Sequence, residues 1–440
     1  MPLSDAAKPI ESTAASRDSH SNRPSALALA TTAALLSSIF SGHFDWVPGG
    51  LPLNRVALFV MAVLALASVG YWQLKWLPVH AVLALQLVWV AASTVWVGTA
   101  TDSYSFFAML DQVIVPSLFF VVGPIAFARE QDRRFLLRGI AVTVIYCSYV
   151  SIAQAFALGA LVFPRFAAEG LVAGEINRAG GPFLQIAANG SALAMAIPLL
   201  VVLFERSTGA WRLTAGVAAA LAAGGAFLTL TRSVWIATLL SIVVSMWFSE
   251  RLRAWLVPSL VALSVSLLAV LTLVSSVADA VVERFGTERS IDDRAITNAA
   301  AVAMVDKYPL TGVGWGRFLS LVDGYVVQPD VGPLTNTHII AHNIILSRAA
   351  ELGLVGAALL VASLVLGPLR AAFRPRPGVD AAWRHALLAS SLAWFVVAML
   401  TPMGYAFSNY LLWLVAGICT VQWQRRSRGR HRPSSPPPDQ

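Results

Sequence analysis

The chain has 440 residues, of which 57% are apolar and only 12% are charged, about half the charged share of a soluble protein. These values exclude a disordered chain and an ordinary soluble enzyme, and the two cysteines exclude a disulfide scaffold. The formal net charge of +8 has two readings, nucleic-acid binding in a soluble protein or basic cytoplasmic loops in a membrane protein. The positions of the arginines therefore decide what the charge means.

Twelve stretches are long and apolar enough, or nearly so, to cross a membrane, which takes roughly 20 residues. In chain order they are 25–40, 56–72, 77–97, 106–127, 139–162, 183–204, 213–230, 234–248, 255–277, 339–366, 386–400 and 410–421. We expect residues 1–24 to form a disordered cytoplasmic tail without a signal-peptide cleavage pattern, 25–423 a transmembrane domain, and 424–440 a basic cytoplasmic tail. The predicted fold class is an all-α polytopic membrane protein.

The basic residues test this count. With both termini in the cytoplasm, 21 of the 31 basic residues fall on the inner side, nine on the outer side, and Arg348 within a span. This bias is typical of inner-membrane proteins, and removing one short span would invert everything after it. Most of the positive charge therefore reports topology, and the outer arginines need another explanation.

Two outer segments, 163–182 and 278–337, are long enough to carry structure. In the second, which is the predicted large periplasmic loop between spans nine and ten, a helix over 292–308 is expected to end at Tyr308–Pro309. Its apolar residues, including Ala300 and Met304, could form a face lying at the membrane surface. The glycine-rich GVGWG that follows indicates turns.

Three outer arginines stand near predicted membrane boundaries: Arg178 before span six, Arg232 at the start of span eight, and Arg294 in the large loop. A single such arginine usually extends to lipid headgroups or pairs locally. A converging set would instead form an anion site, because guanidinium groups bind phosphate oxygens bidentately.

Span ten carries an unusual polar set. His338 and His342 are four residues apart, so on a helix they would share one face. The alternatives are a packed structural pair, a zinc site, or a general base; HExxH and an obvious third ligand are absent, so we expect no metal. Arg348 and Glu351 have the spacing of an internal ion pair, and Asp111 in span four is a buried charge without an evident partner.

These residues resemble a known family. His342-Asn343, nine residues, then Gly353-Leu354-Val355-Gly356 is similar to the pattern H-[NSQ]-x9-G-x2-[GTV] of O-antigen ligases, within the superfamily of ligases and O-antigen polymerases. Asp293-Arg294 followed by MVDKYPLTGVGWGRF, NRAGGPFLQIAANG with Arg178 and Asn189, and TRSVW with Arg232 resemble other family segments in the same order. One departure is that many members have H-x-H-N, whereas here His338 precedes His342 by four residues.

The resemblance implies a GT-C-like glycosyltransferase at the periplasmic face of the bacterial inner membrane, with no cofactor and no metal. It would transfer polysaccharide from undecaprenyl diphosphate to a sugar hydroxyl of lipid A–core, with inversion. By the same resemblance, the catalytic base would be His342 and the diphosphate ligands Arg178, Arg232 and Arg294; the supporting residues would be His338, Asn343 and Asn189.

Other functions remain open at this point. An O-antigen polymerase shares the chemistry but uses a second carrier-linked glycan as acceptor, and a protein O-oligosaccharyltransferase uses a serine or threonine. Outside this class, twelve spans also fit a transporter or flippase, although no two-fold internal repeat is evident. Release of undecaprenyl diphosphate separates an enzyme from a transporter.

Overall fold

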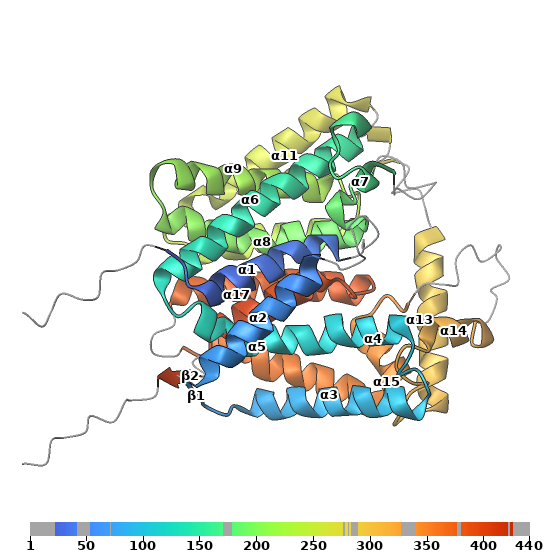
Figure 1. Ribbon diagram of the computed structural model, residues 1–440. Helices are drawn as coiled ribbons and strands as arrows, with labels where there is room; N and C mark the ends of the chain where they lie inside the picture. The colour runs from blue at the N-terminus through green and yellow to red at the C-terminus, as the bar shows by residue number, and fades with distance from the viewer. Residues whose placement is uncertain are drawn as a thin grey trace, which may run out of the picture.

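The protein is a bundle of long α-helices (Figure 1), which confirms the predicted all-α class. This computed structural model describes residues 23–41, 53–70, 72–169, 178–275, 278–279, 281–282, 289–326, 340–375, 380–420 and 423–425. Two short strands, β1 (Trp72–Leu74) and β2 (Trp423–Arg425), pair antiparallel with Trp72 opposite Arg425. Most of each predicted tail, 1–24 and 424–440, lies outside the described residues.

The helices follow the predicted stretches closely. They are α1 (Ala26–Ser37), α2 (Leu53–Val69), α3 (Pro78–Trp96), α4 (Ser103–Met109), α5 (Val115–Ala126), α6 (Glu130–Ala155), α7 (Phe166–Glu169), α8 (Ile186–Arg206), α9 (Gly209–Phe227), α10 (Arg232–Phe248), α11 (Leu256–Leu273), α13 (Arg289–Lys307), α14 (Phe318–Leu321), α15 (Ile344–Leu364), α16 (Arg370–Phe373), α17 (Ala381–Leu400) and α18 (Ala406–Ile418). Short 3-10 turns flank them at Ser38–Phe40, Gly159–Leu161, Gly181–Phe183, Arg253–Trp255 and Val322–Gly324, and π-helical turns occur at Leu110–Ile114 and Val365–Leu369.

Eight of the described helical segments are long and apolar enough to cross a membrane. Four shorter apolar segments, Ala26–Phe40, Leu53–Val69, Arg232–Phe248 and Ala406–Ile418, coincide with the first, second, eighth and twelfth predicted spans. The chain is therefore a multi-pass membrane protein. The exact count of twelve spans remains a prediction, because the four short segments fall below the usual spanning length.

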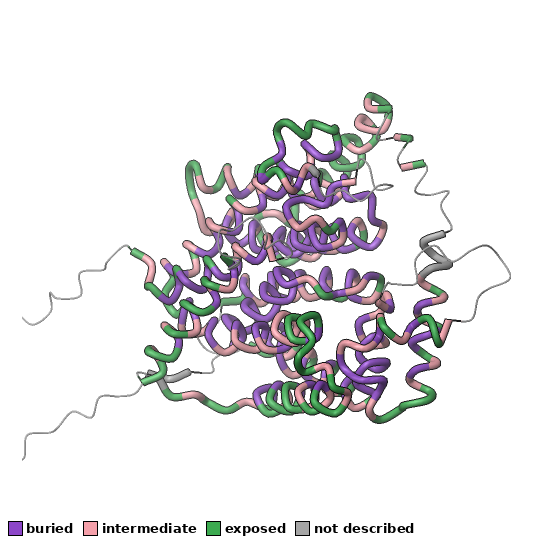
Figure 2. Tube along the Cα trace, turned by 45° about the vertical axis from the view of Figure 1, so that its right-hand side comes forward, coloured by how far each residue is buried: buried purple, intermediate pink, exposed green. Residues whose placement is uncertain are grey.

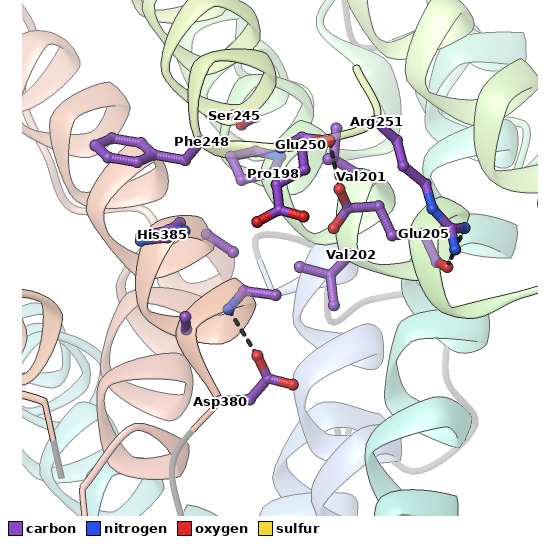
Figure 3. A pocket seen from close by; sticks show the side chains of 14 residues that line it. Pro198, Val201, Val202, Glu205, Ser245, Phe248, Glu250, Arg251, Asp380 and His385 are labelled. Carbon is purple, nitrogen blue, oxygen red and sulfur yellow. Dashed lines mark hydrogen bonds between the residues drawn. The ribbon is translucent and has the colours of Figure 1, made fainter. Parts of the chain in front are cut away.

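Segments predicted to be cytoplasmic meet at one end of the bundle. The backbone N–H of Ser25 donates to Asp132 (2.8 Å), and Arg206 forms ion pairs with Glu130 (3.1 Å) and Asp380. Between α8, α10 and α17 this end also holds a cavity of about 390 Å³, in which Ser249 donates to Glu205 (Figure 3). Four helix boundaries that are distant in the chain are thus held together by charge and hydrogen bonds.

The core is centred on α8, which packs against α9, α10 and α17. Small residues allow this close packing. A Cβ added to Gly190 would lie only 2.5 Å from the side chain of Val234 in α10. Figure 2 shows the buried residues running through the middle of the bundle. In contrast, α11 has no buried residue among those described, and α3 carries a row of exposed apolar side chains. Such surfaces are stable where lipid replaces water.

The helix predicted in the large loop is confirmed as α13 (Arg289–Lys307), which begins three residues earlier and ends one residue earlier than predicted. It runs across the helix ends opposite β1 and β2 (Figure 1). The expected apolar face at the membrane surface is wrong for Ala300 and Met304, which are 1% and 0% exposed. They pack against Phe318 and Ala350, so this face stabilises α13 on the bundle.

Candidate active site

His342 lies immediately before α15, on the side of the bundle where α13 packs. Asn343 is the N-cap of this helix, and its side-chain oxygen accepts hydrogen bonds from the backbone N–H groups of Ile345 (3.0 Å) and Leu346 (3.1 Å). The predicted span beginning at residue 339 is therefore wrong at its start, because 340–343 are not helical. His342 consequently has no helical face to share with His338, and His338 itself lies outside the described residues.

The loop helix α13 fixes His342 from the other side. The backbone N–H of His342 donates to Asn298 Oδ1 at 3.2 Å. Asn298 is one helical turn after Arg294, so α13 presents both residues to the histidine. Asn298 was not among the residues singled out in the sequence, because nothing in the chain indicates that residues 44 apart meet.

The surroundings keep the His342 imidazole neutral. Burial, and secondly the positive charge of Arg294, lowers the pKa of His342 from 6.5 to about 4. Its Nδ1 atom is buried and has no hydrogen-bond partner among the described residues. A neutral imidazole can accept a proton, and the electrostatic influence of Arg294 puts a cation within range of any anion bound beside it.

The side chain of Arg178 contacts the segment that leads into Arg232. The guanidinium of Arg178 donates from Nε to the carbonyl oxygen of Thr229 (3.3 Å) and from a terminal nitrogen to Thr231 Oγ1 (3.1 Å). Thr231 precedes Arg232, the first residue of α10. Two of the three predicted diphosphate ligands therefore belong to one local unit, formed by segments about fifty residues apart.

Asn189 holds this unit in place and is fully buried. Its side-chain nitrogen donates to Ser151 Oγ (2.7 Å) and to the carbonyl oxygen of Ala179 (3.1 Å). The N–H of Gly181, which has φ +59°, donates to the Gln154 side chain at 2.7 Å. Asn189 thus positions the backbone beside Arg178 from within the protein, a positioning role compatible with the support expected of it.

A cavity of about 690 Å³ lies between the segment that follows Arg178 and the segment that precedes His342. Its wall includes Phe183 and Gln185 on one side and Ile340 on another. Neither His342 nor the three arginines belongs to the described lining. The cavity is nevertheless large enough for a sugar ring with a neighbouring phosphate.

Two ionic groups line this cavity, and one of them, Asp111, is the buried charge for which the sequence offered no partner. Arg55 binds both carboxylate oxygens of Asp111, at 2.5 and 2.8 Å, and the Tyr410 hydroxyl also donates to Asp111. Asp111 therefore has partners from α2 and α18. These partners lie 56 and 299 residues away from it in the chain, so no local sequence pattern indicates the contacts. A bidentate arginine–carboxylate pair keeps both charges stable beside lipid.

The predicted ion pair within span ten is confirmed. Arg348 and Glu351 are 3.3 Å apart and both are buried. Arg348 also donates to the Gln112 side chain and lies 4.5 Å from the centre of the Trp315 ring. Glu351 accepts the N–H of Gly316 at 3.1 Å. The pair therefore fastens α15 to the loop that follows α13.

Gly353, the glycine of the His-Asn-x9-Gly pattern, interrupts α15 with φ +70° and ψ −178°. The carbonyl oxygens of Ala350 and Glu351 instead accept the N–H groups of Val313 (2.8 Å) and Gly314 (2.9 Å). A Cβ at Gly353 would lie 2.1 Å from the carbonyl oxygen of Leu310. The two ends of the motif in this chain therefore have different roles: His342 stands before α15, and Gly353 lies where the GVGWG segment packs against α15. The GVGWG segment is confirmed as turns.

Among the described residues, no group of three or more histidine, cysteine, aspartate or glutamate side chains could hold a metal ion. Adjacent Asp292 and Asp293 have side chains outside the described part.

Residues 217–361 match the family model described as O-antigen ligase. The matched region runs from α9 into α15 and contains Arg232, Arg294 and His342, whereas Arg178 and Asn189 precede it. No curated protein matches the chain. The match agrees with the resemblance seen in the motifs, and it supports a membrane glycosyltransferase of the ligase or polymerase type.

Proposed function

We propose that this chain, about a third of which matches the O-antigen ligase family, joins a polysaccharide to lipid A–core. The donor is a glycan on undecaprenyl diphosphate, and the acceptor is a sugar hydroxyl. The reaction occurs at the periplasmic face of the bacterial inner membrane, without metal or cofactor. The observation that carries the proposal is the neutral, half-buried His342, which α13 holds beside Arg294.

In this mechanism, His342 takes the proton of the acceptor hydroxyl. The hydroxyl oxygen forms a bond to the anomeric carbon from the face opposite the diphosphate, so the configuration inverts. The bond from that carbon to the diphosphate oxygen breaks, and its electron pair leaves with undecaprenyl diphosphate. General-base catalysis of this kind contributes roughly 10²–10⁴-fold to rate.

The positive charges stabilise the leaving group. Arg178, Arg232 and Arg294 bind the diphosphate, and their fixed charges stabilise the negative charge that grows on it in the transition state. A bound diphosphate also counters the effect of Arg294 on His342, because a nearby anion favours the protonated imidazole. The pKa of His342 should therefore rise when the donor binds, so that it becomes a stronger base in the reacting complex.

The test is transfer by the purified protein in lipid nanodiscs. Carrier-linked glycan is mixed with lipid A–core, with a second carrier-linked glycan, or with a pilin-like protein, and both the extended acceptor and undecaprenyl diphosphate are measured. We expect extension of lipid A–core alone. Extension of the carrier-linked glycan would make the protein a polymerase, and movement of the carrier without release of undecaprenyl diphosphate would make it a transporter.

A further inference from the structure

A second outer cavity, separate from the one beside Arg55 and Asp111, combines aromatic rings with positive charge. It has a volume of about 600 Å³ and lies between the outer end of α3, the end of α13 and the turns that follow. Trp89 and Trp96 come from α3, and Tyr308 and Tyr325 from the large loop. The described cations of its wall are Lys307 and Arg317.

The cations are arranged for an anionic ligand. The Lys307 ammonium lies 5.5 Å from the centre of each of the Tyr308 and Tyr325 rings, so aromatic faces hold it. No ion pair of Lys307 or Arg317 with a carboxylate occurs within the part of the chain that the structure describes. Their charges therefore stay available to a phosphate or carboxylate that enters the cavity.

The aromatic rings provide flat apolar surfaces beside these charges. Trp96 is 80% exposed, and Trp89 is held by a hydrogen bond from its indole N–H to the carbonyl oxygen of Leu352 (3.0 Å). Flat rings next to cations suit a sugar that carries an anionic group, because the ring faces pack against its C–H surfaces while its polar edge reaches the cations.

The position of the cavity indicates that the sugar is carried on a lipid. Leu85, Val88 and Val95 of α3 are 57%, 64% and 72% exposed, so this flank of the helix faces lipid. The cavity lies at the outer end of the same helix, at the level of lipid headgroups. A membrane amphiphile in the outer leaflet would therefore present its headgroup directly to it.

The cavity is also tied to the helix that carries the candidate base. Its wall includes Val313 and Gly314, whose N–H groups bind the carbonyl oxygens of Ala350 and Glu351 in α15. We propose that this cavity binds the phosphate-bearing sugar headgroup of the lipid acceptor and so holds that acceptor for transfer. The role in transfer rests on the proposed function, whereas the binding itself does not.

The binding test uses purified protein in neutral-lipid nanodiscs and one probe in two forms: phosphorylated lipid A–core and the same molecule after phosphatase treatment. We expect the phosphorylated form to bind roughly tenfold more tightly. Lys307→Gln and Arg317→Gln should each raise the Kd for the phosphorylated form by roughly tenfold. Trp96→Leu should weaken the binding of both probe forms. Arg165→Gln, an exposed outer cation away from the cavity, and Trp76→Leu, an exposed tryptophan at the inner end, are the matched controls.

The outcomes separate the two proposals. Equal binding of both probe forms, or equal binding by Lys307→Gln, Arg317→Gln and Arg165→Gln, overturns the cavity as a phosphosugar site. Competition by phosphatidylglycerol vesicles as strong as that by the phosphorylated probe overturns it too, because the site would then take any anionic lipid headgroup. In the transfer assay, Lys307→Gln should raise the KM for acceptor and leave the KM for donor unchanged. Phosphate-dependent binding without any transfer would refute the proposed function while supporting the site.

Discussion

The titration of His342 can be altered by changing one neighbouring charge. The pKa of His342 falls from 6.5 to about 4, which is roughly 3 kcal/mol of preference for the neutral ring. Burial is the larger cause and Arg294 the smaller one. Arg294→Gln removes a positive charge that opposes the imidazolium, so the pKa should rise by on the order of one unit and stay below 6.5 because the burial remains.

The assay is NMR of protein labelled only at histidine, in nanodiscs, titrated from about pH 3 to pH 8. The spectrum of His342→Gln identifies the His342 signal. Arg165→Gln, an exposed outer cation, should leave the midpoint unchanged. A midpoint for Arg294→Gln equal to that of the wild type would refute the electrostatic link between α13 and His342, and a wild-type midpoint near 6.5 would refute the burial argument as well.

Three further predictions concern the groups that hold the site. Gly353→Ala should cost about 2–4 kcal/mol, because it combines a strained positive φ with a clash on Leu310, whereas Gly224→Ala, with no atom within 4 Å, should be neutral; equal melting temperatures in detergent would contradict this. Asp111→Asn should cost about 2–4 kcal/mol because it removes the carboxylate that Arg55 binds, and the double change with Arg55→Gln should cost less than the sum of the two; strict additivity would argue against the pair. Asn343→Ala should lower the free energy of unfolding by about 1 kcal/mol and should also lower the turnover rate. Asn343→Asp, whose side chain also caps helices, should restore both the stability and the turnover.

The apolar helices were predictable because each is a long apolar run, a local property of the chain. The start of α15 was placed too early, although Asn343 is a favoured N-cap residue and so marks the boundary. The ion pair of Arg348 and Glu351 was predictable because its members are three residues apart on one helix.

The remaining parts of the site depend on contacts between distant segments. Three different helical segments supply Arg55, Asp111 and Tyr410, and α13 supplies the Asn298 that binds the backbone of His342. No local sequence pattern predicts either set of contacts. The docking role of Gly353 likewise requires knowing that the turns after α13 return to α15. The sequence motifs mark such positions without saying what they contact.

If His342 is the base of a glycosyl transfer, replacing its imidazole should stop turnover. Purified wild-type protein and His342→Gln receive carrier-linked glycan and lipid A–core, and ligated lipid is quantified, with His385→Gln, at the cavity between α8, α10 and α17, as the matched control. We expect normal turnover by His385→Gln and a loss of roughly 10²-fold or more for His342→Gln, in a protein that still folds and binds donor. Ligation by His342→Gln at the wild-type rate would contradict this role of His342.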